Sequence, residues 1–124
     1  MAGAILVVDD SATMRMIVQA TLQEAGWSVQ VARDGQDALN QMHAGEFSLV
    51  VTDWNMPNMD GAALVAAMRA NIRFSAVPVL ILTTEDDEDV VQRGQSLGVS
   101  GWIAKPLEPS VLLQAVQCLL GQTA

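Results

Sequence analysis

Short apolar runs alternate along the chain with longer segments in which apolar residues recur every three or four positions. The apolar runs span residues 5–8, 29–31, 47–51, 79–82 and 102–103. Such runs, rich in Val and Ile and bounded by polar residues, are typical of strands buried on both faces. They predict five strands, of which the second and the fifth are the shortest.

The segments between the strands have the spacing of helices that bury one face. Ser11 and Asp60 are predicted N-caps, Gly26 ends the first helix, and Pro109 opens the last one. Cys118 is predicted to pack near the core. The predicted inward-facing residues are, helix by helix, Met14, Ile17, Val18, Leu22 and Ala25; Ala38, Leu39 and Met42; Leu64, Val65, Met68 and Ile72; Val90, Val91 and Leu97; and Leu112, Val116, Leu119 and Leu120.

This strict alternation of strand and helix predicts an α/β fold. Strands separated by helices form a parallel sheet with right-handed crossovers and helices on both of its faces. The 124 residues suit one domain over 1–124, and we find no internal repeat, linker or low-complexity tract.

Composition narrows the classes of partner. The chain is 51% hydrophobic and 16% charged, which is typical of a globular protein, and its formal net charge is -8. That charge argues against binding to nucleic acid or to an anionic membrane surface. One cysteine, no run approaching the ~20 apolar residues of a membrane span and no signal peptide together predict a cytoplasmic protein.

Chemically active side chains follow the predicted strands. Asp9 and Asp10 end the first strand, Asp53 ends the third, Thr83 ends the fourth, and the chain's only lysine, Lys105, follows the fifth. In an open parallel sheet, ligands bind outside the carboxyl ends of the strands, where the strand order reverses. If the first and third strands are neighbours, the three carboxylates converge there.

Three clustered carboxylates need a proton or a cation between them. Hard oxygen ligands without a neighbouring His or Cys suit Mg²⁺, Mn²⁺ or Ca²⁺, and Mg²⁺ is commonly held by one or two carboxylates together with phosphate and water. A lysine opposite the acids suits a phosphate oxygen, and Thr83 can donate a hydrogen bond to another. The pattern predicts a magnesium site at which phosphate is placed on a carboxylate.

Four motifs together resemble the receiver domain of bacterial two-component response regulators, and within it the single-domain CheY-like chemotaxis regulators. They are "VVDDS" at 7–11, "DWNMPNMDG" at 53–61, "LTTE" at 82–85 and "GWIAKP" at 101–106, in order and over almost the whole chain. The resemblance implies a doubly wound, flavodoxin-like sheet with strand order 2-1-3-4-5 and five helices.

The resemblance also implies a role for each motif residue. Asp53 is the phosphoryl acceptor. Asp10 and Asp53 bind Mg²⁺ directly together with the backbone carbonyl of Asn55, whereas Asp9 acts largely through water. Lys105 contacts the phosphate, and its peptide bond to Pro106 is expected to be cis.

The remaining implied roles concern output. Thr83 is the switch hydroxyl, Trp102 occupies the aromatic switch position, and Asn55 and Glu85 tune the lifetime of the phosphoryl group. The implied partners are a histidine kinase of the chemotaxis type, the flagellar motor switch or another output protein, and a phosphatase. The resemblance implies a monomeric signalling protein that catalyses its own phosphorylation and dephosphorylation, not a classical enzyme.

Alternatives remain at this point. The acidic run 85–89 stands where motor-binding relatives have lysines, so a phosphate sink without an output target stays open. A phosphatase with an aspartyl nucleophile needs a second Asp two residues after the first, and Asn55 stands there. A flavin mononucleotide carrier needs a hydroxyl-rich loop after the first strand, where Asp9 and Asp10 would repel phosphate.

Overall fold

A computed structural model describes residues 3–56, 58–84, 88–105 and 107–120, with the side chains of 88–90 left out. The strands, in chain order, are β1 Ala4–Val8, β2 Val29–Ala32, β3 Phe47–Asp53, β4 Val79–Thr83 and β5 Gly101–Ala104. The helices are α1 Ala12–Glu24, α2 Gly35–Ala44, α3 Gly61–Arg69, α4 Glu88–Ser96 and α5 Pro109–Leu120. All five predicted strands are present, each extended by one or more residues.

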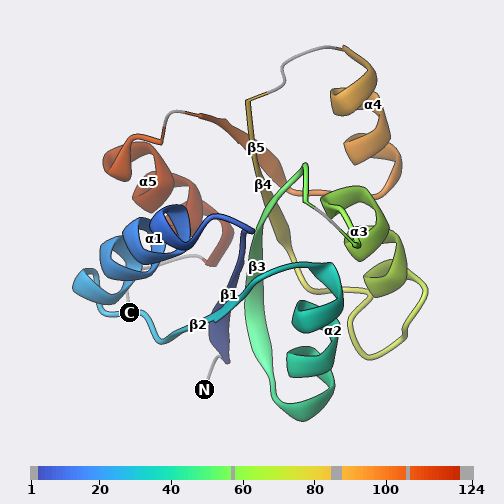
Figure 1. The fold of residues 1–124 in the computed structure, drawn as a ribbon, viewed down its shortest axis with the longest axis horizontal. Helices are drawn as coiled ribbons and strands as arrows, with labels where there is room; N and C mark the ends of the chain where they lie inside the picture. The colour runs from blue at the N-terminus through green and yellow to red at the C-terminus, as the bar shows by residue number, and fades with distance from the viewer. Residues whose placement is uncertain (1–2, 57, 85–87, 106, 121–124) are drawn as a thin grey trace.

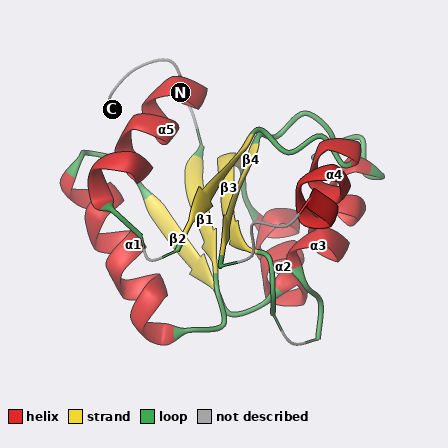
Figure 2. Cartoon of the chain, turned by 90° about the horizontal axis from the view of Figure 1, so that it is seen from above, coloured by secondary structure: helices red, strands yellow, loops and turns green. Residues whose placement is uncertain are grey.

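The five strands form one parallel sheet in the order β2-β1-β3-β4-β5, which confirms the predicted fold. Figures 1 and 2 show the sheet as the middle of three layers, with α1 and α5 on one face and α2, α3 and α4 on the other. The chain adds β2 on one side of β1 and then adds β3, β4 and β5 on the other side. The strand order therefore reverses between β1 and β3. That reversal is where a doubly wound sheet binds its ligands.

Alternation along each strand divides the core into two clusters. The cluster under α2, α3 and α4 contains Leu6, Val8, Val50, Val79 and Ile81 from the sheet. The cluster under α1 and α5 contains Ile5, Val7, Leu49, Val51, Leu80, Leu82 and Ile103. The central strands are buried on both faces, which explains why their sequences are continuous apolar runs instead of alternating patterns.

Side chains just past the strand ends cap the helices that follow. The Ser11 hydroxyl accepts a hydrogen bond from the Met14 backbone N–H at 3.2 Å, and the Asp60 carboxylate accepts one from the Ala63 N–H at 2.8 Å. Both predicted caps are confirmed. Asp34 caps α2 in the same way, accepting from the Asp37 N–H at 2.9 Å.

Three predicted burials are wrong. Ile72 is 95% exposed because α3 ends at Arg69 and the chain turns before it, so that Phe74 enters the core in its place. Ile17 is 44% exposed because it lies at the margin of the face that buries Val18. Cys118 is exposed on α5 instead of packed.

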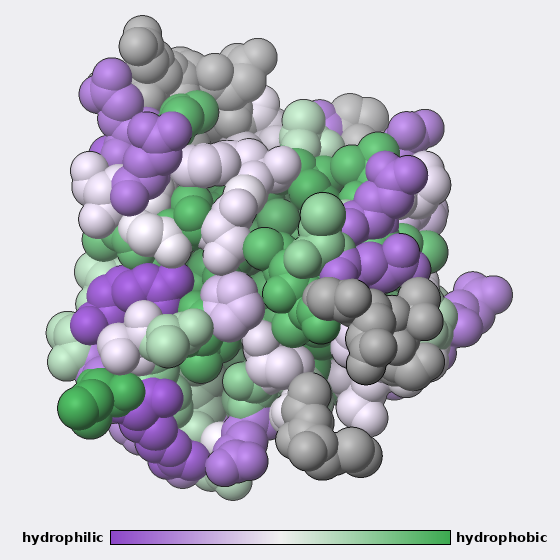
Figure 3. All heavy atoms as spheres, turned by 180° about the vertical axis from the view of Figure 1, so that it is seen from behind, coloured by the Kyte–Doolittle hydropathy of each residue, from purple (hydrophilic) through white to green (hydrophobic). Residues whose placement is uncertain are grey.

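Hydrophobic side chains also reach the surface on the face turned away in Figure 1. The space-filling view of that face shows them gathered in its centre between hydrophilic borders (Figure 3). Several residues of α5 and its preceding loop, including Leu107, Leu113 and Leu119, pack only partly against the core. Within the described residues, no helix is long and apolar enough to cross a membrane.

Arg69, at the end of α3, fastens α4 to the rest of the fold. Its guanidinium donates hydrogen bonds to the carbonyls of Leu97 and Gly98, each at 3.0 Å, just after α4 ends. It also donates to three carbonyls of the loop before β4, those of Phe74, Ser75 and Val77. Burial lowers the pKa of this guanidinium, and among the described residues no carboxylate pairs with it. The carbonyls of two segments therefore carry the whole interaction.

Replacing Arg69 with Met should destabilise the protein by about 2 kcal/mol or more. The partly buried carbonyls that accept hydrogen bonds from Arg69 would lose their donor. Urea unfolding measures this difference. Arg33→Met is the matched control, since the Arg33 side chain is 79% exposed and pairs only loosely, at 3.8 Å, with Asp37. Equal midpoints for the two variants would contradict the structural role of Arg69.

Candidate functional site

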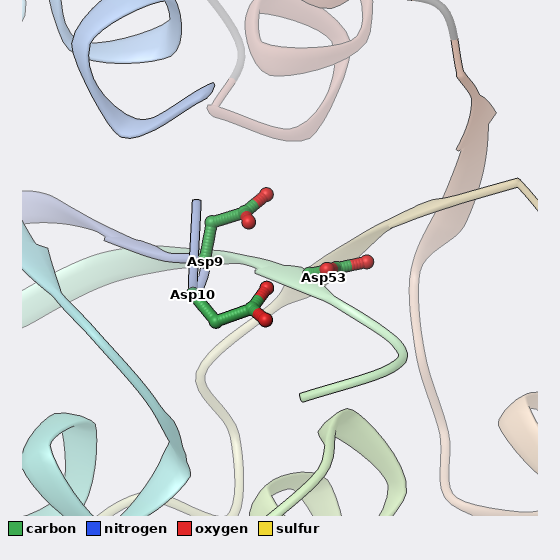
Figure 4. A group of neighbouring side chains, drawn as sticks. All are labelled: Asp9, Asp10 and Asp53. Atoms are coloured by element: carbon green, nitrogen blue, oxygen red, sulfur yellow. The ribbon is translucent and has the colours of Figure 1, made fainter. Parts of the chain in front are cut away.

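Three carboxylates meet where the strand order reverses. Asp9 and Asp10 directly follow β1, and Asp53 is the last residue of β3 (Figure 4). One oxygen from each lies within 4.8 Å of one oxygen from each of the others. Asp9 and Asp53 are buried, whereas Asp10 is exposed. The predicted convergence is confirmed, and the cluster is open to solvent on the side of Asp10.

The ammonium group of Lys105 lies between two of these acids. Its Nζ is 3.3 Å from Asp9 Oδ2 and 3.3 Å from Asp53 Oδ1. The Lys105 backbone N–H donates to the Thr83 carbonyl at 2.9 Å, which fixes the start of the loop after β5 beside the end of β4. The chain's only lysine is thus held at the site by β4 and neutralises part of its charge.

Both carboxylate oxygens of Asp9 already contact other groups of the protein. Oδ1 accepts the Ser11 backbone N–H at 2.9 Å, and Oδ2 pairs with Lys105. Arg15 donates to the Asp9 carbonyl at 2.7 Å. A metal ion at this site would find free carboxylate oxygens more readily on Asp10 and Asp53 than on Asp9.

The loop after Asp53 is shaped by a close backbone approach. The Gly61 N–H donates to the Trp54 carbonyl at 2.9 Å, and a Cβ on Gly61 would lie 2.6 Å from the Asp53 carbonyl oxygen. Only glycine allows α3 to begin this close to the end of β3. Farther along the loop, Asn58 has φ 67° and its amide donates to Asp34 at 3.0 Å, which ties the loop to the start of α2.

Asp53 is a carboxylate of the site whose charged form is disfavoured. Burial raises its pKa above the ordinary value, and the neighbouring Asp9 charge raises it further, while Lys105 opposes both effects. Asp34 behaves in the opposite way. Its pKa is lowered, first by the hydrogen bond from the Asp37 backbone and then by the one from Asn58. A carboxylate whose charged form is disfavoured, placed beside a lysine, is poised to gain from an added cation.

The other predicted site residues lie around this centre. Thr83 is buried at the end of β4, Asn55 is exposed two residues after Asp53, and Trp102 lies on β5 in register with Ile81. Their predicted roles stay predictions. Glu85 and the bond between Lys105 and Pro106 lie outside the described residues.

Sequence reasoning missed two side chains near the site. Arg93 of α4 places its guanidinium 5.6 Å from the centroid of the Trp54 ring, and Trp54 is buried directly after Asp53 in the chain. Arg15 contacts the Asp9 carbonyl from α1. Neither contact had a signal in the sequence, because both join helices to loops that only the folded chain brings together.

The donor set suits a hard divalent cation. It consists of carboxylate oxygens alone, one of them solvent-exposed, with no His or Cys in the cluster. Mg²⁺ bonds of about 2.1 Å place opposite ligands roughly 4.2 Å apart. Ligands at neighbouring positions lie closer, roughly 3.0 Å apart, so these oxygens, which lie within 4.8 Å of one another, would draw together around a bound ion.

Comparison with known proteins agrees with the fold. Residues 5–117 match the response regulator receiver domain family. The chain is 40% identical over 114 residues to the chemotaxis protein CheY of Pseudomonas aeruginosa, covering 91% of this chain and 92% of that protein. It is also 40% identical over 119 residues to the chemotaxis protein CheY1 of Helicobacter pylori, covering 94% and 96% of the two chains. The crystal structure of Vibrio cholerae CheY4 superposes with a TM-score of 0.91 at 38% identity, covering 96% of this chain and 99% of that one.

The acidic cluster and Lys105 lie at the switch point of a doubly wound sheet, which is where such folds bind their ligands. This chain belongs to the response regulator receiver domain family.

The raised pKa of Asp53 predicts how stability depends on pH without metal. Because ionisation of Asp53 costs more in the folded state than in the unfolded state, its contribution to stability is full below the unfolded pKa and is lost as pH rises through the folded pKa. In EDTA, Asp53→Asn should therefore raise the urea midpoint at about pH 7, with the gain vanishing below about pH 4.

Asp34→Asn provides a control of opposite sign. The lowered pKa of Asp34 gives stability that is present above its unfolded pKa and is lost as pH falls through its folded pKa. This variant should lower the midpoint near neutrality and converge with the native chain in acid. A parallel pH profile for the two variants would show that burial of Asp53 does not disfavour its charge.

Proposed function

We propose that this protein is a phosphoryl-accepting switch of a two-component system, with Asp53 as the acceptor. The observation that carries the proposal is the placement of Lys105, 3.3 Å from an oxygen of Asp53 and 3.3 Å from an oxygen of Asp9. A phosphoryl group on Asp53 would lie beside this ammonium group, at an edge of the sheet that Asp10 leaves open to solvent. Membership of the receiver family supports the proposal.

The metal in this proposal is Mg²⁺, held by Asp10, Asp53 and the backbone carbonyl of Asn55. Asp9 supports the site through water, because its own oxygens are engaged by Ser11 and Lys105. When bound, Mg²⁺ supplies positive charge that offsets the repulsion among the carboxylates and the negative charge of phosphate.

The chain's own groups carry out the transfer. An oxygen of the ionised Asp53 carboxylate forms a bond to phosphorus while the bond from phosphorus to the donor's imidazole nitrogen breaks, and the imidazole leaves with the electron pair and takes up a proton. The Lys105 ammonium stabilises the charge that develops on the phosphoryl oxygens. Hydrolysis by water then returns the carboxylate. Asn55, exposed beside the acceptor, is placed to influence the approach of that water.

The similar proteins are the basis for proposing a phosphate donor and an output target. Those at 40% identity are chemotaxis proteins, so we propose a chemotaxis histidine kinase as phosphate donor and a flagellar switch or another output protein as target. Thr83 is proposed as the hydroxyl that turns toward the phosphate, and Trp102 as the aromatic side chain that responds. A phosphate sink that lacks an output target is the second candidate, favoured by the acidic residues in the run 85–89.

Phosphorylation at a single site tests the proposal directly. A small acyl phosphate with Mg²⁺ should add one phosphoryl group to the native protein and none to Asp53→Asn, measured by intact mass spectrometry. Asp60→Asn is the control, because Asp60 caps α3 and lies outside the acidic cluster. Equal labelling of native protein and Asp53→Asn would assign the acceptor elsewhere.

Metal affinity tests the proposed ligands. Native protein should bind Mg²⁺ in the millimolar range, followed through the fluorescence of Trp54, which adjoins Asp53. Asp10→Asn should weaken binding by about 100-fold or more, whereas Asp9→Asn should lose only the roughly 10–100-fold typical of a residue that supports a ligand. Trp54→Phe should abolish the fluorescence response without changing the affinity measured by calorimetry. An unchanged titration in Asp10→Asn would remove Asp10 from the metal site.

A further inference from the structure

Trp102 lies on the face of the sheet that α2, α3 and α4 cover. It pairs with Ile81 in the register of β4 and β5, and Ile81 belongs to the core cluster on that face. Side chains two residues apart on a strand share a face, so Trp102 and Thr83 point to the same side of the sheet. The indole ring packs against that cluster from the edge strand and is only partly buried.

The ring of Trp102 occupies the space that a side chain at position 94 would fill. A Cβ built on Gly94 would lie 2.3 Å from Trp102 Cζ2 and 3.1 Å from Cη2, so only a hydrogen fits there. Gly94 lies inside α4, where glycine costs helix stability relative to alanine. At this position the absence of a side chain gives the ring of Trp102 its room.

The same packing leaves the indole N–H without a partner. Trp102 Nε1 is buried and has no hydrogen-bond acceptor among the described residues. A buried donor without an acceptor costs free energy, which it recovers if the ring turns toward water. Apolar packing at Gly94 therefore holds the ring in, and the unsatisfied N–H favours turning it out. Two such opposed contributions make the ring sensitive to small changes nearby.

Gly94 also lies where α4 is attached. Its carbonyl accepts hydrogen bonds from the N–H groups of Leu97 and Val99, both at 3.1 Å, and so closes the end of the helix. Arg69 binds the carbonyls of Leu97 and Gly98 directly after it. Farther toward α3, a cavity of about 520 Å³ opens between Ala62 and Ala66 on one side and Arg93 and Leu97 on the other. The indole at Gly94 is thus a contact between β5 and the carboxyl half of α4.

We propose that Gly94 is the positioning residue for Trp102. Its missing side chain admits the indole edge into α4, and occupation of that space couples the end of β5 to the position of α4. The inference extends the proposed function, since Lys105, just past the end of β5, contacts the acceptor Asp53. The packing itself can be tested without any phosphate chemistry.

The first test places 5-fluorotryptophan in the otherwise native chain and uses ¹⁹F NMR. The fluorine is then on Cζ3, which is not one of the atoms closest to Gly94, so it does not enter the contact itself. Trp102→Phe assigns the Trp102 resonance. Gly94→Ala should move this resonance and give it the H₂O–D₂O isotope shift of an exposed fluorine, while the Trp27 resonance stays in place.

Gly45→Ala is the matched control, because a Cβ there comes no closer than 3.8 Å to its neighbours. It should leave the Trp102 resonance unchanged. The inference is overturned if Gly94→Ala also leaves the resonance and its isotope shift as they are in the native chain.

Unfolding midpoints provide a second measurement that does not depend on the label. In a Trp102→Leu background, which removes the ring, Gly94→Ala should raise the midpoint because alanine is the better helix former. With Trp102 present, the same substitution should lower the midpoint or leave it unchanged, because the ring must leave its place. An equal rise in both backgrounds would show that the two residues do not interact, and would overturn the inference.

Beryllofluoride with Mg²⁺ separates this inference from the proposed function. The native Trp102 resonance should shift on addition, and Gly94→Ala should reduce the shift severalfold while phosphorylation of Asp53 stays within twofold of native. A full response in Gly94→Ala overturns the role of Gly94 and leaves the switch intact. A native protein without response, in which Gly94→Ala still displaces the ring in the free state, supports the packing and contradicts the switch.

Discussion

The ammonium group of Lys105 is the interaction on which the site depends. Two buried carboxylates, Asp9 and Asp53, end neighbouring strands of one sheet, and their charges repel each other at close range. Lys105 contacts both at 3.3 Å and is itself fixed by a backbone hydrogen bond to Thr83. The compensation is incomplete, since the pKa of Asp53 remains raised. Unsatisfied negative charge at an open edge of the sheet suits the site to a cation, on which the proposed function relies.

The alternation of side chains along the strands separates the acidic cluster from Thr83 and Trp102, the proposed switch residues. Ile5 and Val7 face α1 and α5, and Asp9, two residues after Val7, follows the same alternation. Asp53 follows Val51 in the same way. Thr83 and Trp102 point the other way, toward α2, α3 and α4. On the proposed function, charge would change at the edge above one layer of helices, whereas Thr83 and Trp102 lie toward the other layer. The end of β5 links the two faces, because Lys105, which contacts the acids, follows Trp102 on the same segment.

The described contacts of helix α4 that fix its carboxyl end come from Arg69 and Trp102. Arg69 binds the carbonyls that follow it, and Trp102 lies in the space left by Gly94. Toward α3 the helix leaves an open groove, and Arg93 reaches across it to the ring of Trp54. On the proposed function, the contact of Arg93 with the ring of Trp54 places α4 next to the residue that follows Asp53. Motion of α4 would need two arrangements of similar free energy. We base that proposal on the opposed contributions at Trp102, which are the apolar packing at Gly94 and a buried indole N–H without an acceptor among the described residues.

The sequence by itself determined the sheet, its helices and the members of the acidic site. Continuous apolar runs, N-caps such as Ser11 and Asp60, and acids placed after the runs are local signals, and local signals survive without knowledge of the fold. The tertiary structure alone decided which residues meet across the chain. It set the distances from Lys105 to Asp9 and Asp53, the reach of Arg69 to α4 and the approach of Trp102 to Gly94. It also exposed Ile72, whose helical spacing predicted burial, because α3 ends at Arg69 and the chain turns before it. The contacts of Lys105 with Asp9 and Asp53, and of Arg69 with Gly98, join residues far apart in sequence, so no periodicity or composition can encode them.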